Sequence, residues 1–344
     1  MLGTFLKGSK TASRVSAIAV TSHISPYIAM YPWSASGFGT KYANPSTLPP
    51  NQGYDVSFHP NSNILAVSHA SSPNISVYPF SASGFGTKYA NPSTLPTGNG
   101  QGVAFNPAGT AIAVAHNNSP YITAYPWSAS GFGTKYANPS TLPTGNGMCV
   151  AFNPAGTALA VGHVTSPYIT AYPWSTSGFG TKYTNPSTLP TNTVFGVAFN
   201  PAGTAIAIAF AQNTYISVYP WSTSGFGTKY ANPITVNLPT GIGYGVTFNS
   251  SGTVLVISHY SFPYVTAYAW SASGFGTKYA SPSTAVSGSG RQVEFNSDDS
   301  VIAISSDNTP YIQVYNWSGS GFGTKYTNPS TLLAGVGSSV AFSG

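Results

Sequence analysis

The chain has 344 residues and a formal net charge of +6, and only 5% of its residues are charged, against a usual share of about 25%. Because 42% of the residues are apolar and 14% are aromatic, the composition argues for a folded chain and against disorder or a helical bundle. The single cysteine, Cys149, excludes an internal disulfide and any cysteine-based metal site.

No uninterrupted apolar run reaches about 18 residues, so no membrane span is expected. Residues 1–10 lack the apolar core of a secretion signal, so export by that route is not expected and the localisation stays open. Composition alone does not say what the protein does.

An internal repeat organises the whole chain. The string Ser-Gly-Phe-Gly-Thr-Lys-Tyr occurs seven times, and its phenylalanines are separated by 47, 47, 47, 47, 49 and 47 residues. They are Phe38, Phe85, Phe132, Phe179, Phe226, Phe275 and Phe322. Repeats of this length are typical of propellers, whose blades each hold four strands, whereas the coil of a β-helix is shorter.

The third copy shows the elements expected in each repeat. Residues 103–105 predict a short apolar strand, and residues 106–109, Asn-Pro-Ala-Gly, predict a type I turn. Residues 110–115 alternate small and bulky apolar types, and residues 121–127 are rich in aromatic and β-branched types, so both predict strands. After a turn at residues 128–133, residues 134–136 are expected to begin a fourth strand.

The two ends of the chain predict how the ring closes. The chain ends with Ser-Val-Ala-Phe at residues 339–342, a copy of the first strand of a blade with nothing after it. Its first complete strand, near residues 16–20, matches a second strand instead. We therefore expect an all-β, seven-bladed β-propeller over residues 16–344, with four-stranded antiparallel blades and the C-terminal strand completing the N-terminal blade. Residues 1–15 are expected to form an N-terminal arm.

The repeat also resembles a known family. Phe-Asn-Pro-Ala-Gly at residues 105–109, followed by a small apolar strand and by Tyr-Pro-Trp-Ser at residues 125–128, is similar to the motifs of WD-repeat propellers. The family's Trp-Asp dipeptide is Trp-Ser here, and its Gly-His is missing. More loosely, the Gly-Phe-Gly-Thr-Lys-Tyr string is similar to propellers of tailed phages and environmental bacteria. The resemblance implies a fold and does not fix a function.

Candidate acids and bases are few. The chain has only five carboxylates, namely Asp55, Glu294, Asp298, Asp299 and Asp307. Asp298 and Asp299 fall in a predicted turn, while Asp55 and Glu294 belong to innermost strands two blades apart, too far for an expected catalytic dyad. Because general acid–base catalysis usually needs a carboxylate pair or a histidine with a partner, the sequence argues against an enzyme and predicts no cofactor and no metal.

Histidine and tryptophan recur once per blade. His69, His116, His163 and His259 each end a predicted second strand, which favours hydrogen-bonded strand-end residues over a shared metal site. The tryptophans end the third strand, where packing between blades is the plainer interpretation and a platform for stacking sugars is the alternative.

One lysine per repeat forms a predicted ring. Its members are Lys41, Lys88, Lys135, Lys182, Lys229, Lys278 and Lys325. Spread around a wide disc, these charges are screened from one another over about 8 Å, so nucleic-acid binding is not favoured. Lysine beside an outermost strand protects that edge from pairing with other chains, which we take as its role.

The copies differ most at one position, four residues before the phenylalanine of the first strand. The residues there are Tyr54, Gln101, Met148, Phe195, Tyr244, Arg291 and Ser338. The loop between the second and third strands also varies, and it carries Tyr260 and Phe262 in one blade. Both segments are expected on one face, around the mouth of the central channel, where exposed aromatics with arginine suggest a binding surface. Tolerance of loops to change is the alternative explanation.

These observations favour a non-enzymatic binding or structural propeller that presents variable loops to a protein partner or larger assembly. A phage virion, as a tail or capsid-associated part, or a cell-surface structure is the expected setting, which would place the protein in a virion or outside the cell after assembly. The alternative is a multivalent lectin that binds cell-surface glycans through its repeated aromatic and Asn side chains.

Overall fold

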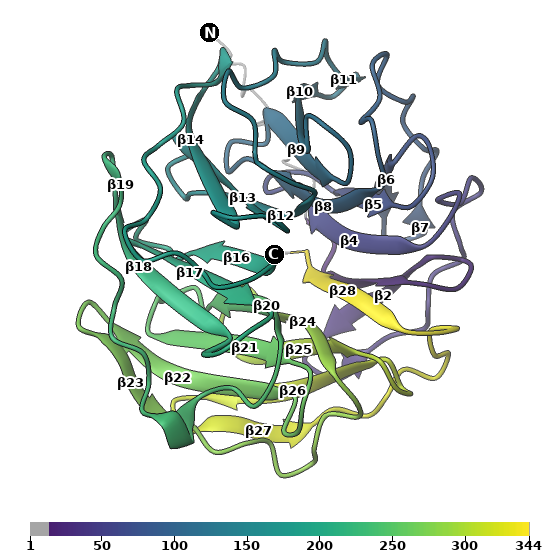
Figure 1. Cartoon of the computed structure of the whole chain (residues 1–344). Coiled ribbons are helices and arrows are strands. Elements are labelled where there is room, and N and C mark those ends of the chain that lie inside the picture. Colours follow the sequence, from purple (N-terminus) through teal and green to yellow (C-terminus); the bar gives the residue numbers. More distant parts are fainter. Residues whose placement is uncertain (1–13, 344) are drawn as a thin grey trace, which may run out of the picture.

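The computed structural model describes residues 14–343, which form seven four-stranded antiparallel sheets arranged as a ring around a central channel (Figure 1). The seven-bladed propeller expected from the repeat is confirmed. The predicted N-terminal arm lies outside the described residues except for Arg14 and Val15, so its role stays a prediction. Within residues 14–343 no helix has the length and apolar character needed to cross a membrane.

Each blade has an inner strand beside the channel. The inner strands are β4 (Gly53–Phe58), β8 (Gly100–Phe105), β12 (Gly147–Phe152), β16 (Val194–Phe199), β20 (Gly243–Phe248), β24 (Gly290–Phe295) and β28 (Gly337–Phe342). Each contacts the next around the ring, and β28 contacts both β24 and β4, so the circle is complete.

The second strands are buried along their whole length. They are β1 (Ala17–Ser22), β5 (Ile64–His69), β9 (Ala111–His116), β13 (Ala158–His163), β17 (Ala205–Phe210), β21 (Val254–His259) and β25 (Val301–Ser306). Neighbouring blades cover both faces of these strands, which explains why the first four residues of each strand are apolar.

The third strands pair with the second ones. They are β2 (Ile28–Ser34), β6 (Ile75–Ser81), β10 (Ile122–Ser128), β14 (Ile169–Ser175), β18 (Ile216–Ser222), β22 (Val265–Ser271) and β26 (Ile312–Ser318). The outer strands are β3 (Gly37–Phe38), β7 (Gly84–Phe85), β11 (Gly131–Phe132), β15 (Gly178–Phe179), β19 (Gly225–Phe226), β23 (Gly274–Lys278) and β27 (Gly321–Lys325). A short 3₁₀ helix, η1 (Thr235–Asn237), lies in the one repeat that is two residues longer.

The fourth strand begins earlier than the sequence suggested. In the third blade Gly131 and Phe132 pair with Ser128 and Trp127, so the outer strand consists of the residues assigned to a turn. The reversal is tight because Gly131 adopts a φ of +98°, a conformation that residues with a side chain rarely adopt. Only β23 and β27 extend to the lysine of the repeat.

The closing strand is confirmed as a part of the first blade. In the β28-β1-β2-β3 sheet, β28 pairs antiparallel with β1 (Figure 1). The register includes Ala19 opposite Ala341 and Val20 opposite Val340. Residues more than 300 positions apart thus share one sheet.

Aromatic side chains join each blade to the next. Trp127 is buried and packs edge to face against Phe132 of its own outer strand, with ring centroids 5.0 Å apart. It makes a second edge-to-face contact, also at 5.0 Å, with Tyr89 of the preceding blade. The tryptophans therefore pack between blades, and their burial does not leave them free as a sugar platform.

Candidate functional site

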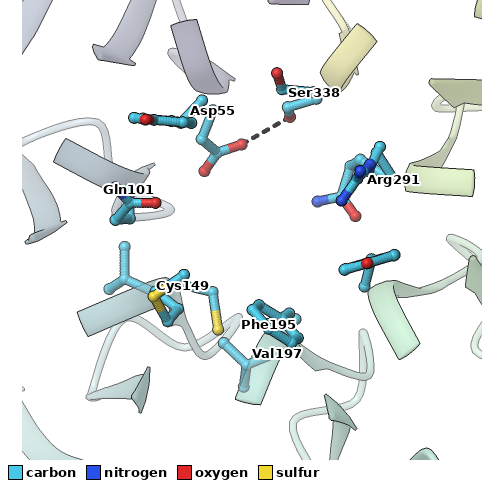
Figure 2. Close-up of a pocket in the computed structure, with 14 residues that line it drawn as sticks. Asp55, Gln101, Cys149, Phe195, Val197, Arg291 and Ser338 are labelled. Carbon is cyan, nitrogen blue, oxygen red and sulfur yellow. Dashed lines mark hydrogen bonds between the residues drawn. The ribbon is translucent and has the colours of Figure 1, made fainter. Parts of the chain in front are cut away.

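All seven residues of the most variable position line a single cavity at the mouth of the central channel. They are Tyr54, Gln101, Met148, Phe195, Tyr244, Arg291 and Ser338. Figure 2 shows side chains from the different inner strands pointing into a common opening. The cavity has a volume of about 110 Å³, and Asp55, Cys149 and Gln292 also line it.

A β-bulge in each inner strand explains this convergence. In the β8–β11 blade, Gly100 pairs with His116 and Gly102 with the adjacent Ala115, so Gln101 between them has no partner. The corresponding shift recurs around the ring, and in β12 it falls at Met148. A bulge turns the extra residue away from its ladder and commonly lies beside active sites. The bulge therefore aims the variable side chain at the channel mouth.

Arg291 is the fixed cation of this site. Its Nε and Nη2 donate hydrogen bonds of 2.5 and 3.0 Å to the two carboxylate oxygens of Asp307. Its guanidinium carbon also lies 4.5 Å from the centre of the Tyr244 ring. The Arg291 side chain is 31% exposed, so the cation is held in place and still reaches solvent.

Asp55 is the half-buried carboxylate of the site. Oδ1 accepts hydrogen bonds from the backbone N–H of Val56, at 2.9 Å, and from Ser339 Oγ, at 2.7 Å. Oδ2 accepts from the backbone N–H of Val103 at 2.9 Å. Burial raises the pKa of Asp55, and these three donors oppose that rise. An ionised carboxylate can only accept hydrogen bonds, so three converging donors favour the ionised form of Asp55.

Two further groups beside the channel are kept neutral. Burial raises the pKa of Glu294 on β24 to about 8, and the negative charge of Asp55 contributes to the rise. Burial also raises the pKa of the Cys149 thiol, so it is not an active thiolate. Glu294 does not line the cavity, and β28 lies between its strand and that of Asp55, so these two carboxyls do not form a dyad there.

Tyr260 and Phe262 lie outside the cavity. Their loop follows β21 and lines a separate hollow together with Asp307. Sequence reasoning did not find the pairing of Asp307 with Arg291, because it considered carboxylates only as acid–base pairs. The sequence did contain a signal for this pair. When the seven copies are overlaid, only one blade has charged residues at the positions of Arg291 and Asp307, and the two charges are opposite.

The lysine ring lies far from the cavity, beside the outer strands. Lys135 donates hydrogen bonds to the carbonyl of Tyr136, at 3.1 Å, and to the side chain of Asn138, at 2.5 Å. The equivalent bonds recur at Lys41, Lys88, Lys182, Lys229 and Lys325. At Lys278 a serine, Ser281, replaces the asparagine. Protection of the sheet edge stays a prediction for this ring.

The strand-end histidines are buried and neutral. His116 Nε2 lies 2.9 Å from Thr123 Oγ1 on the adjacent strand, and His69, His163 and His259 have equivalent hydroxyl partners. Burial lowers the pKa of each of the four to about 4. No three His, Cys, Asp or Glu side chains come together as a metal site in the part of the chain that the structure describes.

Comparison with known proteins identifies relatives by fold alone. No family model matches the chain, and no curated protein matches its sequence. A Lactobacillus plantarum protein of solved structure has a TM-score of 0.75 at 14% identity, covering 96% of this chain and 99% of its own. A Bacteroides uniformis protein described as a "putative 6-phosphogluconolactonase" has a TM-score of 0.74 at 13% identity, covering 95% of this chain and 99% of its own. The periplasmic gluconolactonase of Pseudomonas aeruginosa has a TM-score of 0.70 at 14% identity, covering 96% and 99%.

These structures correct the functional expectation drawn from the sequence. The prediction of a non-enzymatic binding or structural propeller, and of a chain that is not an enzyme, is contradicted by similar structures whose names are gluconolactonase or "putative 6-phosphogluconolactonase". The lectin, phage and virion interpretations find no support among them. The sequence prediction relied on the scarcity of carboxylates, but it did not consider that all seven inner strands contribute residues to the same cavity. At this identity the likeness itself shows the fold, and we conclude that the chain is a seven-bladed β-propeller.

Proposed function

We propose that the protein hydrolyses a small lactone, an internal ester, bound in the cavity at the mouth of the central channel. The observation that carries the proposal is Arg291, a cation fixed by Asp307 and Tyr244 at the rim of a cavity that also contains the Asp55 carboxylate. The names of several propellers with the same ring, which include gluconolactonase, support the same reaction class.

Arg291 is suited to stabilise the charge that develops on the lactone carbonyl oxygen. A guanidinium has five N–H donors, and Asp307 takes only two of them, so donors remain for a ligand. Because the ion pair sets the orientation of Arg291 before substrate binds, little reorganisation is needed during the reaction. Donors fixed in this way are typically the largest single contribution to acyl-transfer catalysis.

Asp55 is suited to accept the proton of the attacking water. In the proposed step the water oxygen bonds to the carbonyl carbon while Asp55 takes its proton. The ring C–O bond then breaks, and Asp55 returns the proton to the departing alkoxide. One lactone and one water give one hydroxy acid, which ionises and releases a proton to solvent.

The size of the cavity limits the substrate. Its volume of about 110 Å³ is near that of a cavity, about 150 Å³, that holds a benzene ring. We therefore expect the cavity to hold no more than a single five- or six-membered ring, and not a polymer. Gln101 and Ser338 add polar groups that suit a hydroxylated ring.

The direct test is proton release in a pH-stat with δ-gluconolactone as the probe. We expect a rate proportional to protein concentration and above spontaneous hydrolysis. Arg291→Gln is expected to lower kcat about 100-fold, as loss of an oxyanion donor does. Arg14→Gln is the matched control, because Arg14 lies outside the cavity, where its Nη2 donates to the His59 carbonyl. The absence of protein-dependent release, or equal rates for the two variants, would overturn the proposal.

We also infer a kinship with the WD-repeat propellers. Its support is the sequence of the repeat, in particular residues 105–109 and 125–128, and the shared ring of blades. The missing Trp-Asp dipeptide marks a divergent branch of these propellers.

A further inference from the structure

A second hollow lies beside the cavity, and its walls are aromatic. Tyr260 and Phe262 are 53% and 65% exposed, unusually high for large apolar side chains. With Tyr264 they line a space of about 410 Å³. The residue before the loop proline, Phe262 in this blade, is serine in four others, so the aromatic wall is specific to one side of the ring.

The hollow and the cavity share one wall. Asp307 lines the hollow, and its carboxylate holds Arg291, which lines the cavity. Ser289 completes the connection, because its Oγ donates to the Tyr260 carbonyl at 3.0 Å and its carbonyl accepts from the Asp307 N–H at 3.1 Å. A ligand bound at Arg291 in the cavity therefore has the aromatic hollow beside it, on the side of Asp307.

The chemistry of the hollow selects a neutral, flat group. Its one charged lining residue, Asp307, is already paired with Arg291, so neither a cation nor an anion finds an uncompensated partner there. The rings of Tyr260 and Phe262 offer apolar faces and edges that pack well against another ring. Asn308 supplies a polar edge for a hydroxyl or carbonyl substituent.

We propose that the hollow binds an aryl substituent carried by the lactone whose ring occupies the cavity, so that the substrate is an aryl-substituted lactone. This inference rests on the proposed function, since the position of the reactive ring sets the position of its substituent. The Arg291–Asp307 pair then stands between the two lobes, contacting the lactone on one side and bordering the aryl group on the other.

The kinetic test compares a phenyl-substituted δ-lactone with δ-valerolactone, which lacks the ring. The variant Tyr260→Asn/Phe262→Ser installs residues found at the equivalent positions of another blade, Asn117 and Ser119, so the loop has a precedent in the same chain. We expect KM for the phenyl lactone to rise about tenfold, with kcat within about twofold, and the constants for δ-valerolactone to stay unchanged. Ser119→Ala in the equivalent loop is the control and should change neither. Equal effects on both lactones, or no effect, would overturn the inference.

A binding test separates this inference from the proposed function. The probe is a phenyl-substituted δ-lactam, which resists hydrolysis, observed by saturation-transfer NMR. Strong saturation of the phenyl protons that disappears in Tyr260→Asn/Phe262→Ser supports the aryl site even if no lactone is hydrolysed. Hydrolysis of δ-valerolactone without phenyl saturation would retain the proposed function and overturn the aryl site.

Discussion

Ser339 donates a hydrogen bond of 2.7 Å to Asp55, and the two residues are 284 positions apart in the chain. Ser339 lies on β28, the strand that closes the ring, and Asp55 lies on β4 of the next blade. Because Asp55 also accepts from Val103 on β8, one carboxylate connects three successive blades around the channel. The carboxylate that we propose as the catalytic base therefore also connects the closing strand to the rest of the ring.

Removal of this hydrogen bond should weaken the closed ring. Ser339→Ala is expected to lower the free energy of unfolding by about 1.5–3 kcal/mol, the usual contribution of a hydrogen bond to a charged group. Ser338→Ala is the matched control, since the neighbouring Ser338 Oγ is buried without a hydrogen-bond partner, so its removal breaks no hydrogen bond and should not lower the free energy of unfolding. Urea denaturation of both variants measures the difference, and equal midpoints would contradict the assigned role of Ser339.

Glu294 should make the protein less stable at alkaline pH. Its pKa is raised from 4.5 to about 8 in the folded state, chiefly by burial, so folding favours the protonated form. Protonated Glu294 therefore stabilises the folded state fully below pH 4.5, and this contribution is lost as the pH rises through 8. Relative to Glu294→Gln, the wild type should lose about 4 kcal/mol between pH 5 and pH 9. Parallel stability profiles of the two proteins would show that folding does not raise the pKa of Glu294.

The strand-end histidines should make the protein sensitive to acid. Their pKa values are lowered from 6.5 to about 4 by burial, so folding favours the neutral ring. The stability that the neutral histidines provide is fully present above pH 6.5 and is lost as the pH falls through 4. Each histidine is expected to lower the free energy of unfolding by about 3 kcal/mol near pH 4.

The chain itself supplies a replacement for one of these histidines. In the β16–β19 blade, Phe210 and Ser217 occupy the positions of His116 and Thr123. The variant His116→Phe/Thr123→Ser should shift acid unfolding to lower pH, as followed by circular dichroism, and change stability little at pH 8. An unchanged acid midpoint would contradict a buried neutral His116.

The tight turn before each outer strand should depend on its glycine. Gly131 has a φ of +98°, and a Cβ there would lie 3.3 Å from the Tyr89 ring. Gly131→Ala is therefore expected to cost about 1–3 kcal/mol of stability. Gly319→Ala is the comparison, because nothing lies within 4 Å of the Cβ it would add and its φ is unstrained. Thermal unfolding should separate the two variants, and a similar small shift in both would contradict this account of the turn.

The sequence predicted the ring well because the repeat leaves little freedom. A period of 47 residues, with turn signals at fixed places, specifies the blades, and the unmatched strand at residues 339–342 specifies their closure. The outer strand was misplaced by a few residues because the paired segment Gly131–Phe132 is only two residues long and begins at a left-handed glycine. The β-propensity of the local sequence does not reveal a strand that is paired over only two residues.

The candidate site was predicted in part. Overlaying the seven copies identified the residues at the channel mouth, since variation concentrated at the bulge position. The roles of Asp55 and Asp307 were not predictable in this way. Their partners, Ser339 and Arg291, are brought to them by ring closure and by a loop from the same blade, and neither contact follows from the repeat pattern.

The most direct test of the account is a crystal structure of the protein soaked with a gluconolactam, a sugar lactam that mimics the lactone and resists hydrolysis. We expect density for one ring at the mouth of the central channel, with its carbonyl oxygen within hydrogen-bond distance of the Arg291 guanidinium. Density between blades on the opposite face, or an empty channel mouth at saturating ligand, would contradict the assignment of this cavity as the site of hydrolysis.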